Sequence, residues 1–157
     1  RWCVVSIPSI FPPSRQARVI GIRGEMAFMK HCEEKGLKSR LTRDRMQRWD
    51  ITVHGKKVDV KTMRTCSPMS SDFNIDLSSA QVSLESDIYA FVFYNEKKKK
   101  FTIAGALPRD EYLKKAVLKR EGENERSGKF TYSCDTFVVK VSDLLPIEKI
   151  VRCRVVP

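Results

Sequence analysis

A chain of 157 residues with 41% hydrophobic residues is long enough for one domain with its own core, and it is not composed like a disordered segment. The formal net charge of +11 indicates a polyanionic partner. The sequence contains no long apolar stretch and no obvious basic amphipathic helix, so nucleic acid is favoured over a membrane surface as that partner.

Residues 1–20 are expected to form an arm or a linker, and residues 21–157 a single domain. Because the chain begins at Arg1 rather than Met, we expect a processed product or a fragment of a longer protein. Residues 2–11 are apolar, but Pro8 interrupts them and they lack the basic segment and the cleavage site of a signal peptide.

Residues 21–36 have the pattern of a helix. Ile22, Met26 and Met29 recur at helical spacing, and Gly36 suits the position that follows a helix end. A basic segment from Arg40 to Arg48 comes next and leads directly into the following element.

Residues 50–62 have the pattern of a β-hairpin with its turn at His54-Gly55, where a glycine suits a two-residue loop with positive φ. With this turn Asp50 lies opposite Asp59, and Lys61 lies on the same face as Asp59. A loop at Gly55-Lys56 would keep the three side chains together, whereas a three-residue loop would separate the two acids. The other face is predicted to pack on the core through Ile51, Val53, Val58 and Val60.

Two facing carboxylates repel each other unless a cation lies between them. A hard ion such as Mg²⁺ binds through one or two carboxylates, water and substrate phosphate, so the hairpin indicates phosphodiester chemistry in which a lysine assists the attacking water. The alternative is an exposed hairpin with ordinary surface acids and one salt bridge. The same acid-x-Lys spacing occurs at Glu33 and Glu96, but only Asp59 lies in a strand-like segment with a second acid across a turn.

Downstream, residues 74–84 are predicted to form a helix and residues 87–94 a buried strand. Residues 101–105 are expected to pair with that strand across a lysine-rich turn. A helix is expected over residues 108–120, closed by Gly122, then a loop over residues 121–129 and strands at 130–141 and 147–156. Ser78-x-x-Gln81 fits a capping box, which we favour over a role of Gln81 at the site.

The order of these elements resembles the PD-(D/E)XK nuclease superfamily, in which a helix carries a Glu, one strand an Asp and the next an acid-x-Lys. Glu25, after Gly24, is the candidate for the helix acid. The chain departs from the common pattern in having Trp49 before Asp50, where many relatives have Pro, and Asp59 where Glu is commoner. The resemblance covers residues 21–94 with motifs.

The resemblance implies an α/β fold of the restriction-endonuclease-like type. It has an α-β-β-β-α-β core with a mixed central sheet flanked by helices, here extended by C-terminal strands. It implies a Mg²⁺-dependent endodeoxyribonuclease, with Mn²⁺ as a substitute, that leaves 5′-phosphate ends. Catalytic roles fall on Glu25, Asp50, Asp59 and Lys61, and metal ligands on Asp50, Asp59, Glu25 and the Val60 carbonyl.

DNA is the expected partner, RNA remains open, and a homodimer is expected by resemblance; no membrane or nucleotide cofactor is expected. Restriction, homing, junction-resolving and repair roles are equally compatible with the motifs. Candidate nucleic-acid contacts are Arg43, Arg45, Arg48, Lys56, Lys57 and Gln81.

Two other classes stay open: a nucleic-acid-binding module that does not cut, and a basic structural or assembly protein. The first is disfavoured because all four catalytic residues are present together. The five cysteines are widely spaced with no Cys-x-x-Cys pair, which argues against a zinc site. They favour a reducing intracellular compartment, such as cytoplasm or nucleus, over secretion.

Overall fold

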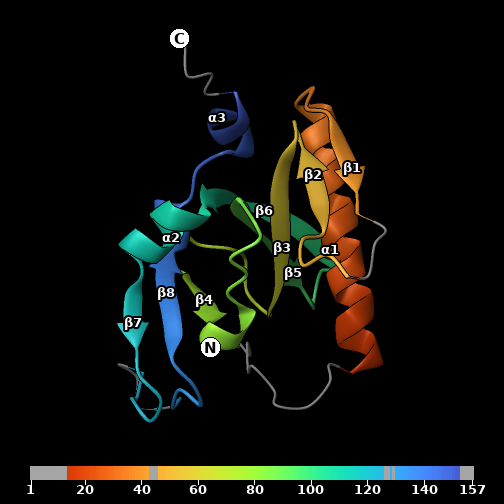
Figure 1. Ribbon diagram of the computed structural model, residues 1–157. Helices are drawn as coiled ribbons and strands as arrows, with labels where there is room; N and C mark the ends of the chain where they lie inside the picture. The colour runs from red at the N-terminus through yellow and green to blue at the C-terminus, as the bar shows by residue number, and fades with distance from the viewer. Residues whose placement is uncertain (1–13, 43–45, 126–127, 129, 153–157) are drawn as a thin grey trace.

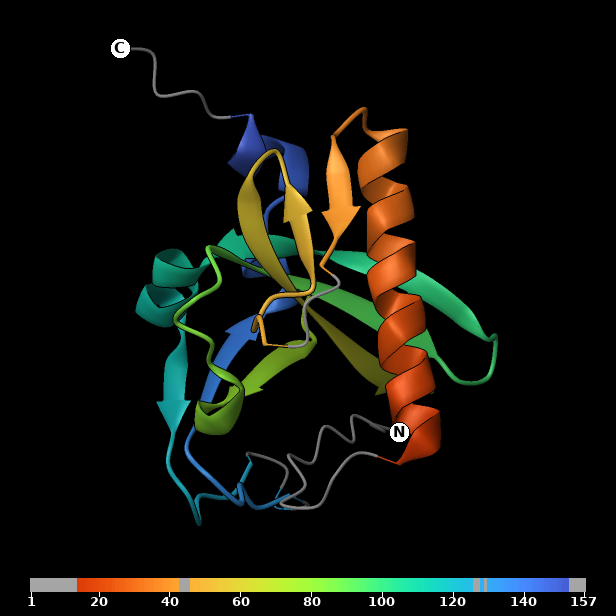
Figure 2. The same cartoon turned by 45° about the vertical axis from the view of Figure 1, so that its right-hand side comes forward.

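The computed structural model describes residues 14–42, 46–125, 128 and 130–152. It is a mixed α/β structure with a five-stranded mixed sheet, a separate three-stranded sheet and few helices (Figures 1 and 2). The order of strands is β1-β2-β3-β5-β6 in the large sheet and β4-β8-β7 in the small one. The helices and strands are α1 (Arg15–Glu34), β1 (Ser39–Leu41), β2 (Ile51–Val53), β3 (Lys56–Thr65), β4 (Asn74–Ser78), the 3₁₀ helix η1 (Ser79–Gln81), β5 (Ile88–Asn95), β6 (Lys100–Pro108), α2 (Arg109–Lys115), β7 (Val117–Lys119), β8 (Thr136–Lys140), the 3₁₀ helix η2 (Val141–Asp143) and α3 (Ile147–Val151).

The predicted first helix is present, and it begins at Arg15, inside the segment expected to be an arm or a linker. The Ser14 hydroxyl caps it by accepting a hydrogen bond from the Ala17 amide at 3.1 Å. Of the apolar residues that indicated the helix, Ile22 and Met26 are 56% and 60% exposed, and Met29 is partly buried against the first cluster. The face toward the sheet is instead formed by Ile20, Gly24, Phe28 and Cys32.

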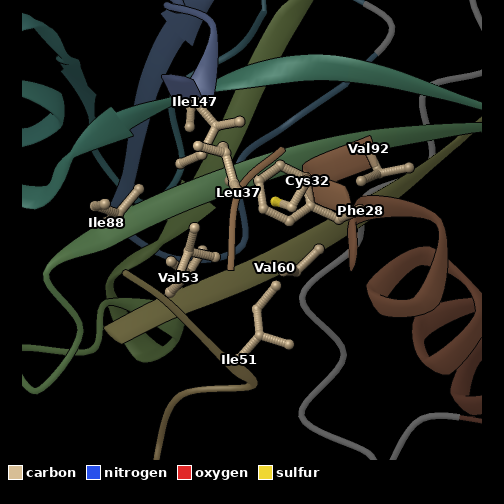
Figure 3. Close-up of a cluster of buried hydrophobic side chains, with 12 residues drawn as sticks. Phe28, Cys32, Leu37, Ile51, Val53, Val60, Ile88, Val92 and Ile147 are labelled. Atoms are coloured by element: carbon tan, nitrogen blue, oxygen red, sulfur yellow. The ribbon is translucent and has the colours of Figure 1, made fainter. Parts of the chain in front are cut away.

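Two apolar clusters cover the two faces of the large sheet. The first lies between the sheet, α1 and α3, and Figure 3 shows Phe28 and Cys32 of α1 next to Val60 and Val92. The second lies between the large and the small sheet, where α2 adds the buried Tyr112. The Tyr112 hydroxyl donates to the Phe137 carbonyl at 2.8 Å, which ties α2 to the small sheet. The hairpin residues Ile51, Val53, Val58 and Val60 all belong to the first cluster, as predicted.

The predicted two-residue turn is confirmed, because His54 and Gly55 both have positive φ, of 47° and 79°. The resulting register pairs Ile51 with Val58 and Val53 with Lys56. The predicted strands at 87–94 and 101–105 are also confirmed as β5 and β6, which pair antiparallel. In contrast, β3 and β5 are parallel.

The predicted helix over residues 74–84 is wrong, because this segment forms β4 and then η1. Ile75 and Leu77 are fully buried and alternate with polar residues, and this period of two pairs the segment with β8. The capping contact of Gln81 is present at the start of η1. Its Oε1 accepts hydrogen bonds from the Ser78 amide at 3.1 Å and from the Ser78 hydroxyl at 3.0 Å.

Two C-terminal predictions also need correction. The helix expected over 108–120 ends at Lys115, because the following residues form β7 and pair with β8. Gly122 has a φ of +86° and lies in a turn, where its amide donates to the Tyr132 carbonyl at 2.8 Å. Of residues 130–141, which were expected to form one strand, only Thr136–Lys140 belong to β8. The strand expected at 147–156 is wrong as far as Val151, because these residues form the helix α3. This helix follows Pro146 and buries Ile147 in the first cluster. Residues beyond 152 lie outside the described part.

Among the described residues, no helix is both long and apolar enough to cross a bilayer. Of the cysteines, Cys32, Cys66 and Cys134 lie in the described part, and Cys32 is buried there. The central sheet and the two apolar clusters on its faces form the core of the described part of the chain.

Candidate active site

The candidate site lies where β2 ends and β3 continues. Pairing between the two strands stops at Ile51 and Val58, one residue earlier than predicted, so Asp50 and Asp59 are not a regular cross-strand pair. The Asp50 amide donates to the Val58 carbonyl at 3.0 Å. Its carboxylate accepts a hydrogen bond at 2.8 Å from the Val60 amide, which has no β2 partner at this point. This contact holds the Asp50 carboxylate against the backbone of β3.

Asp59 and Lys61 project from β3 next to Asp50. The Asp59 residue is only 5% exposed, and its Oδ2 lies 3.1 Å from Lys61 Nζ. The Asp59 and Asp50 carboxyl groups are also in hydrogen-bonding contact. The structure thus brings together the two acids and the lysine that the hairpin pattern predicted.

Glu25 joins this group from α1. Its carboxyl is half-buried, and it lies close enough to Asp50, Asp59 and Lys61 to interact with them electrostatically. The helix comes this close because Gly24 has no side chain: a Cβ at that position would lie 1.8 Å from Thr62 Oγ1. All four residues expected to be catalytic therefore meet at one place, and they come from α1, the segment before β2, and β3.

The three carboxyl groups bind protons more tightly than free acids do. Burial is the main cause, and it raises the pKa of Glu25 and of Asp50 above the ordinary range. Burial likewise raises the pKa of Asp59 to about 7, against the opposing effect of the Lys61 cation and with the support of the Asp50 charge. Lys61 alone does not balance three acids, so the cluster carries excess negative charge when all three are ionised.

The oxygen donors in this cluster suit a hard divalent ion. Carboxylates are the protein ligands that Mg²⁺ uses, commonly only one or two of them together with water and phosphate. Within residues 14–42, 46–125, 128 and 130–152, no group of three or more His, Cys, Asp or Glu side chains has the arrangement of a complete metal-binding set. Asp50 and Asp59 are the two neighbouring carboxyl groups here that could hold such an ion.

A shell of hydrogen bonds that the sequence did not reveal holds the backbone around the site. The Ser83 and Ser86 hydroxyls donate to the Arg48 carbonyl at 3.4 and 3.5 Å, two residues before Asp50. Asp87 forms two hydrogen bonds with the backbone of Lys57. Its Oδ2 accepts one from the Lys57 amide at 2.9 Å, and its own amide donates one to the Lys57 carbonyl at 2.8 Å. Serines in a loop have no distinctive spacing, so no pattern in the sequence indicated these contacts.

Three of the candidate nucleic-acid contacts, Arg48, Lys56 and Lys57, are exposed next to the hairpin. Lys57 Nζ lies 4.5 Å from the ring centre of Trp49, a cation–π contact that positions the lysine. Arg43 and Arg45 lie outside the described residues. In the described part Gln81 contacts Ser78 rather than the acidic cluster, which leaves it with the capping role.

Comparison with known proteins adds no assignment. No protein-family model matches the chain, and no curated protein or solved structure is significantly similar to it.

Proposed function

We propose that this protein is a Mg²⁺-dependent endodeoxyribonuclease of the PD-(D/E)XK type. The observation that carries the proposal is the meeting of Glu25, Asp50, Asp59 and Lys61 from separate elements in one half-buried cluster. A structural ion pair would need only one acid for the lysine. Three acids with raised pKa values around one lysine are unfavourable for stability, and such an arrangement is typical of a functional site.

The topology supports the same proposal. The resemblance implies an α-β-β-β-α-β core with a mixed sheet, and α1, β1, β2, β3 and β5 follow that order. β1, β2 and β3 pair antiparallel, and β5 pairs parallel with β3. The difference lies in the crossover, where β4 and η1 occupy the place of the expected helix. The acids lie before that crossover, so the difference does not disturb them.

In the proposed site Asp50 and Asp59 hold Mg²⁺, and Mn²⁺ would substitute for it. Because the N–H and C=O of one strand residue point to the same side, the Val60 carbonyl faces Asp50 as its amide does, and it offers a further oxygen. When bound, the metal ion supplies a water of lowered pKa and polarises the phosphate.

Lys61 has the second role. Its ammonium group lies next to Asp59, where it would orient the attacking water and stabilise the negative charge that develops on the phosphate oxygens. Glu25 would hold a water of the metal shell or bind the ion directly. Attack by this water in line with the leaving 3′ oxygen leaves the phosphate on the 5′ end.

DNA as the substrate is supported by charge. The chain carries a formal net charge of +11; Arg48 and Lys57 are exposed two residues from Asp50 and Asp59, and Lys56 is exposed next to the turn. A polyanion bound along these side chains would deliver a phosphate to the metal and would release counterions on binding.

The decisive experiment measures cleavage of plasmid, linear duplex, branched and single-stranded DNA and of RNA, with Mg²⁺ or EDTA. The native chain is compared with Asp59→Asn and Lys61→Ala, and with the control variants Asp72→Asn and Lys114→Ala, which change exposed residues of the same types. We expect Mg²⁺-dependent cutting that only the first two variants lose. Nucleic-acid binding without cutting would support a non-catalytic module, and no binding at low salt would support a structural protein.

A further inference from the structure

A cavity of about 340 Å³ lies where the parallel strands β3 and β5 end. Thr65 and Asn95, the last residues of these strands, pair with each other, and both line the cavity. In open α/β sheets, ligands commonly bind outside the carboxyl ends of the parallel strands. The volume is within the range of about 300–1,000 Å³ for small-molecule sites. The cavity thus has the position and the size of a ligand site.

Hydrogen bonds within the chain shape the two loops beside this cavity. After β3, the Thr65 hydroxyl donates to the Ser67 carbonyl at 3.0 Å and accepts from the Ser67 amide at 3.1 Å. After β5, Asn95 Oδ1 accepts hydrogen bonds from the Lys97 and Lys98 amides at 3.0 and 3.1 Å. The side-chain nitrogen of Asn95 remains able to donate. Both loops are therefore held in place before any ligand binds.

The lining of this cavity is positively charged. Lys98 and Lys100 supply two ammonium groups, Thr102 adds a hydroxyl, and none of the described residues that line the cavity is acidic. Within the described part of the chain, neither lysine forms an ion pair. The nearest acid along the chain, Glu96, pairs with Arg64 instead. These groups would attract an anion, and ammonium groups are common partners of phosphate.

Three further residues, Pro68, Met69 and Phe93, give the cavity an apolar part. Pro68 is exposed and Met69 is partly buried, whereas Phe93 is buried. Pro68 and Met69 are therefore the apolar side chains that a ligand would contact. A small inorganic anion would leave them exposed to water, whereas a ligand that joins a phosphate to an aromatic base would cover them. The combination of cationic and apolar groups favours a nucleotide over phosphate alone.

We propose that this cavity binds one nucleotide, with its phosphate against Lys98 and Lys100 and its base against Pro68 and Met69. A free mononucleotide and a nucleotide within a nucleic-acid strand present the same groups, and the experiment below separates these two sources.

The nucleotide site is separate from the acidic cluster. Thr65 lies on the same face of β3 as Lys61 but four residues farther along, a distance of about 13 Å at the rise of a strand. Binding there requires neither the metal ion nor the acids of the cluster. The proposal therefore does not depend on the proposed nuclease activity.

The test is a titration of the full chain with deoxyadenosine 5′-phosphate at low salt in EDTA, followed by ³¹P NMR of the nucleotide. We expect saturable binding that Lys98→Ala and Lys100→Ala each weaken by about tenfold, because each removes a charge-assisted contact with the phosphate. Lys97→Ala is the matched control, since it removes an equal charge from an exposed lysine that does not line the cavity. It should leave the Kd nearly unchanged. Inorganic phosphate should bind more weakly than the nucleotide.

Competition with a short oligothymidylate, also in EDTA, separates the two sources. Displacement of the bound mononucleotide would assign the cavity to a nucleotide within a strand, and binding without displacement would assign it to a free nucleotide. The proposal would be overturned if deoxyadenosine 5′-phosphate did not bind saturably. Equal weakening by Lys97→Ala and Lys100→Ala would also overturn it, and so would an equal affinity for inorganic phosphate.

Discussion

Gly24 of α1 and Thr62 of β3 lie in direct contact, so close that a Cβ on the glycine would be 1.8 Å from Thr62 Oγ1 and 2.9 Å from its Cβ. This approach sets the distance between helix and strand. Because Glu25 is the next residue, the same contact also sets how far its carboxyl reaches toward Asp50. The absence of one side chain thus links the packing of α1 to the geometry of the acidic cluster.

We therefore expect Gly24→Ala to push α1 away from β3 and to displace Glu25. Overpacking of this kind costs about 1–3 kcal/mol of unfolding free energy, more than the roughly 1 kcal/mol that alanine gains over glycine within a helix. A displacement of about 1 Å at a catalytic group lowers rates by up to about 10²-fold. Urea unfolding and cleavage rates measure the two effects.

Gly21→Ala is the matched control for that variant. A Cβ at Gly21 meets nothing within 4 Å, so this variant should be as stable as the native chain or more stable, with unchanged cleavage. Native stability and rate in Gly24→Ala would show that the helix does not depend on this contact.

The second prediction concerns the hydrogen bond from the Val60 amide to the Asp50 carboxylate. Asp50→Ala leaves this amide without its acceptor and should lower the unfolding free energy by about 1–3 kcal/mol. Asp50→Asn keeps an acceptor oxygen and removes a charge that repels Asp59 and Glu25, so it should be at least as stable as the native chain. Both variants should lose cleavage, since neither retains the carboxylate.

Denaturant unfolding in EDTA, so that no metal contributes, would separate the two variants. If Asp50→Asn were as unstable as Asp50→Ala, the charge and not the acceptor would be what the fold requires. That outcome would contradict the positioning role that we assign to the hydrogen bond.

The sequence revealed the local part of the site well and its surroundings poorly. The turn at His54-Gly55 follows from glycine's freedom at positive φ, and the two faces of the hairpin follow from the alternation of side chains along a strand. Asp59 and Lys61 therefore lie on the same face of the hairpin, whichever turn joins its strands. Glu25 was placed only by resemblance, because its approach depends on Gly24 fitting against Thr62, a contact between segments distant in sequence.

The errors in the fold have a common origin. The segment that became β4 contains Ile75 and Leu77 with period two, yet short polar segments with a capping motif also fit a helix, and only its pairing with β8 decides between them. The same strand determines where α2 ends, because residues after Lys115 pair with it as β7. Pairing with a distant strand outweighed local propensity in both places.

A third prediction follows from the pKa of Asp59, which burial raises to about 7. A carboxyl whose folded pKa is raised binds its proton more tightly when folded. Its contribution to stability is therefore greatest at low pH and is lost as the pH rises toward 7. At pH 8 in EDTA, Asp59→Asn should exceed the native chain in unfolding free energy by about 1–4 kcal/mol, and the gap should close toward pH 4.

Mg²⁺ should reverse this order. At pH 8 it should stabilise the native chain, because an ion held by the folded cluster is absent from the unfolded chain, and it should have little effect on Asp59→Asn. Thermal unfolding of the native chain and of Asp59→Asn, with and without Mg²⁺, tests both expectations. A native chain more stable than Asp59→Asn in EDTA would mean that the ion pair with Lys61 outweighs burial and repulsion.

The last prediction concerns the exposed basic side chains beside the site. If Arg48 and Lys57 each contact a phosphate, replacing either by alanine should weaken DNA binding uniformly across sequences. It should also reduce the slope of log K against log salt by about 0.9, the value for one phosphate contact. Lys114→Ala on α2 is the control and should leave the slope unchanged. Binding is measured by fluorescence anisotropy at several salt concentrations in EDTA, so that no cleavage intervenes.

Because Lys57 lies over the Trp49 ring, Trp49→Ala should release the lysine and weaken binding while leaving the slope near its native value. Equal slopes for Lys57→Ala, Arg48→Ala and the native chain would place the nucleic acid on another face of the molecule.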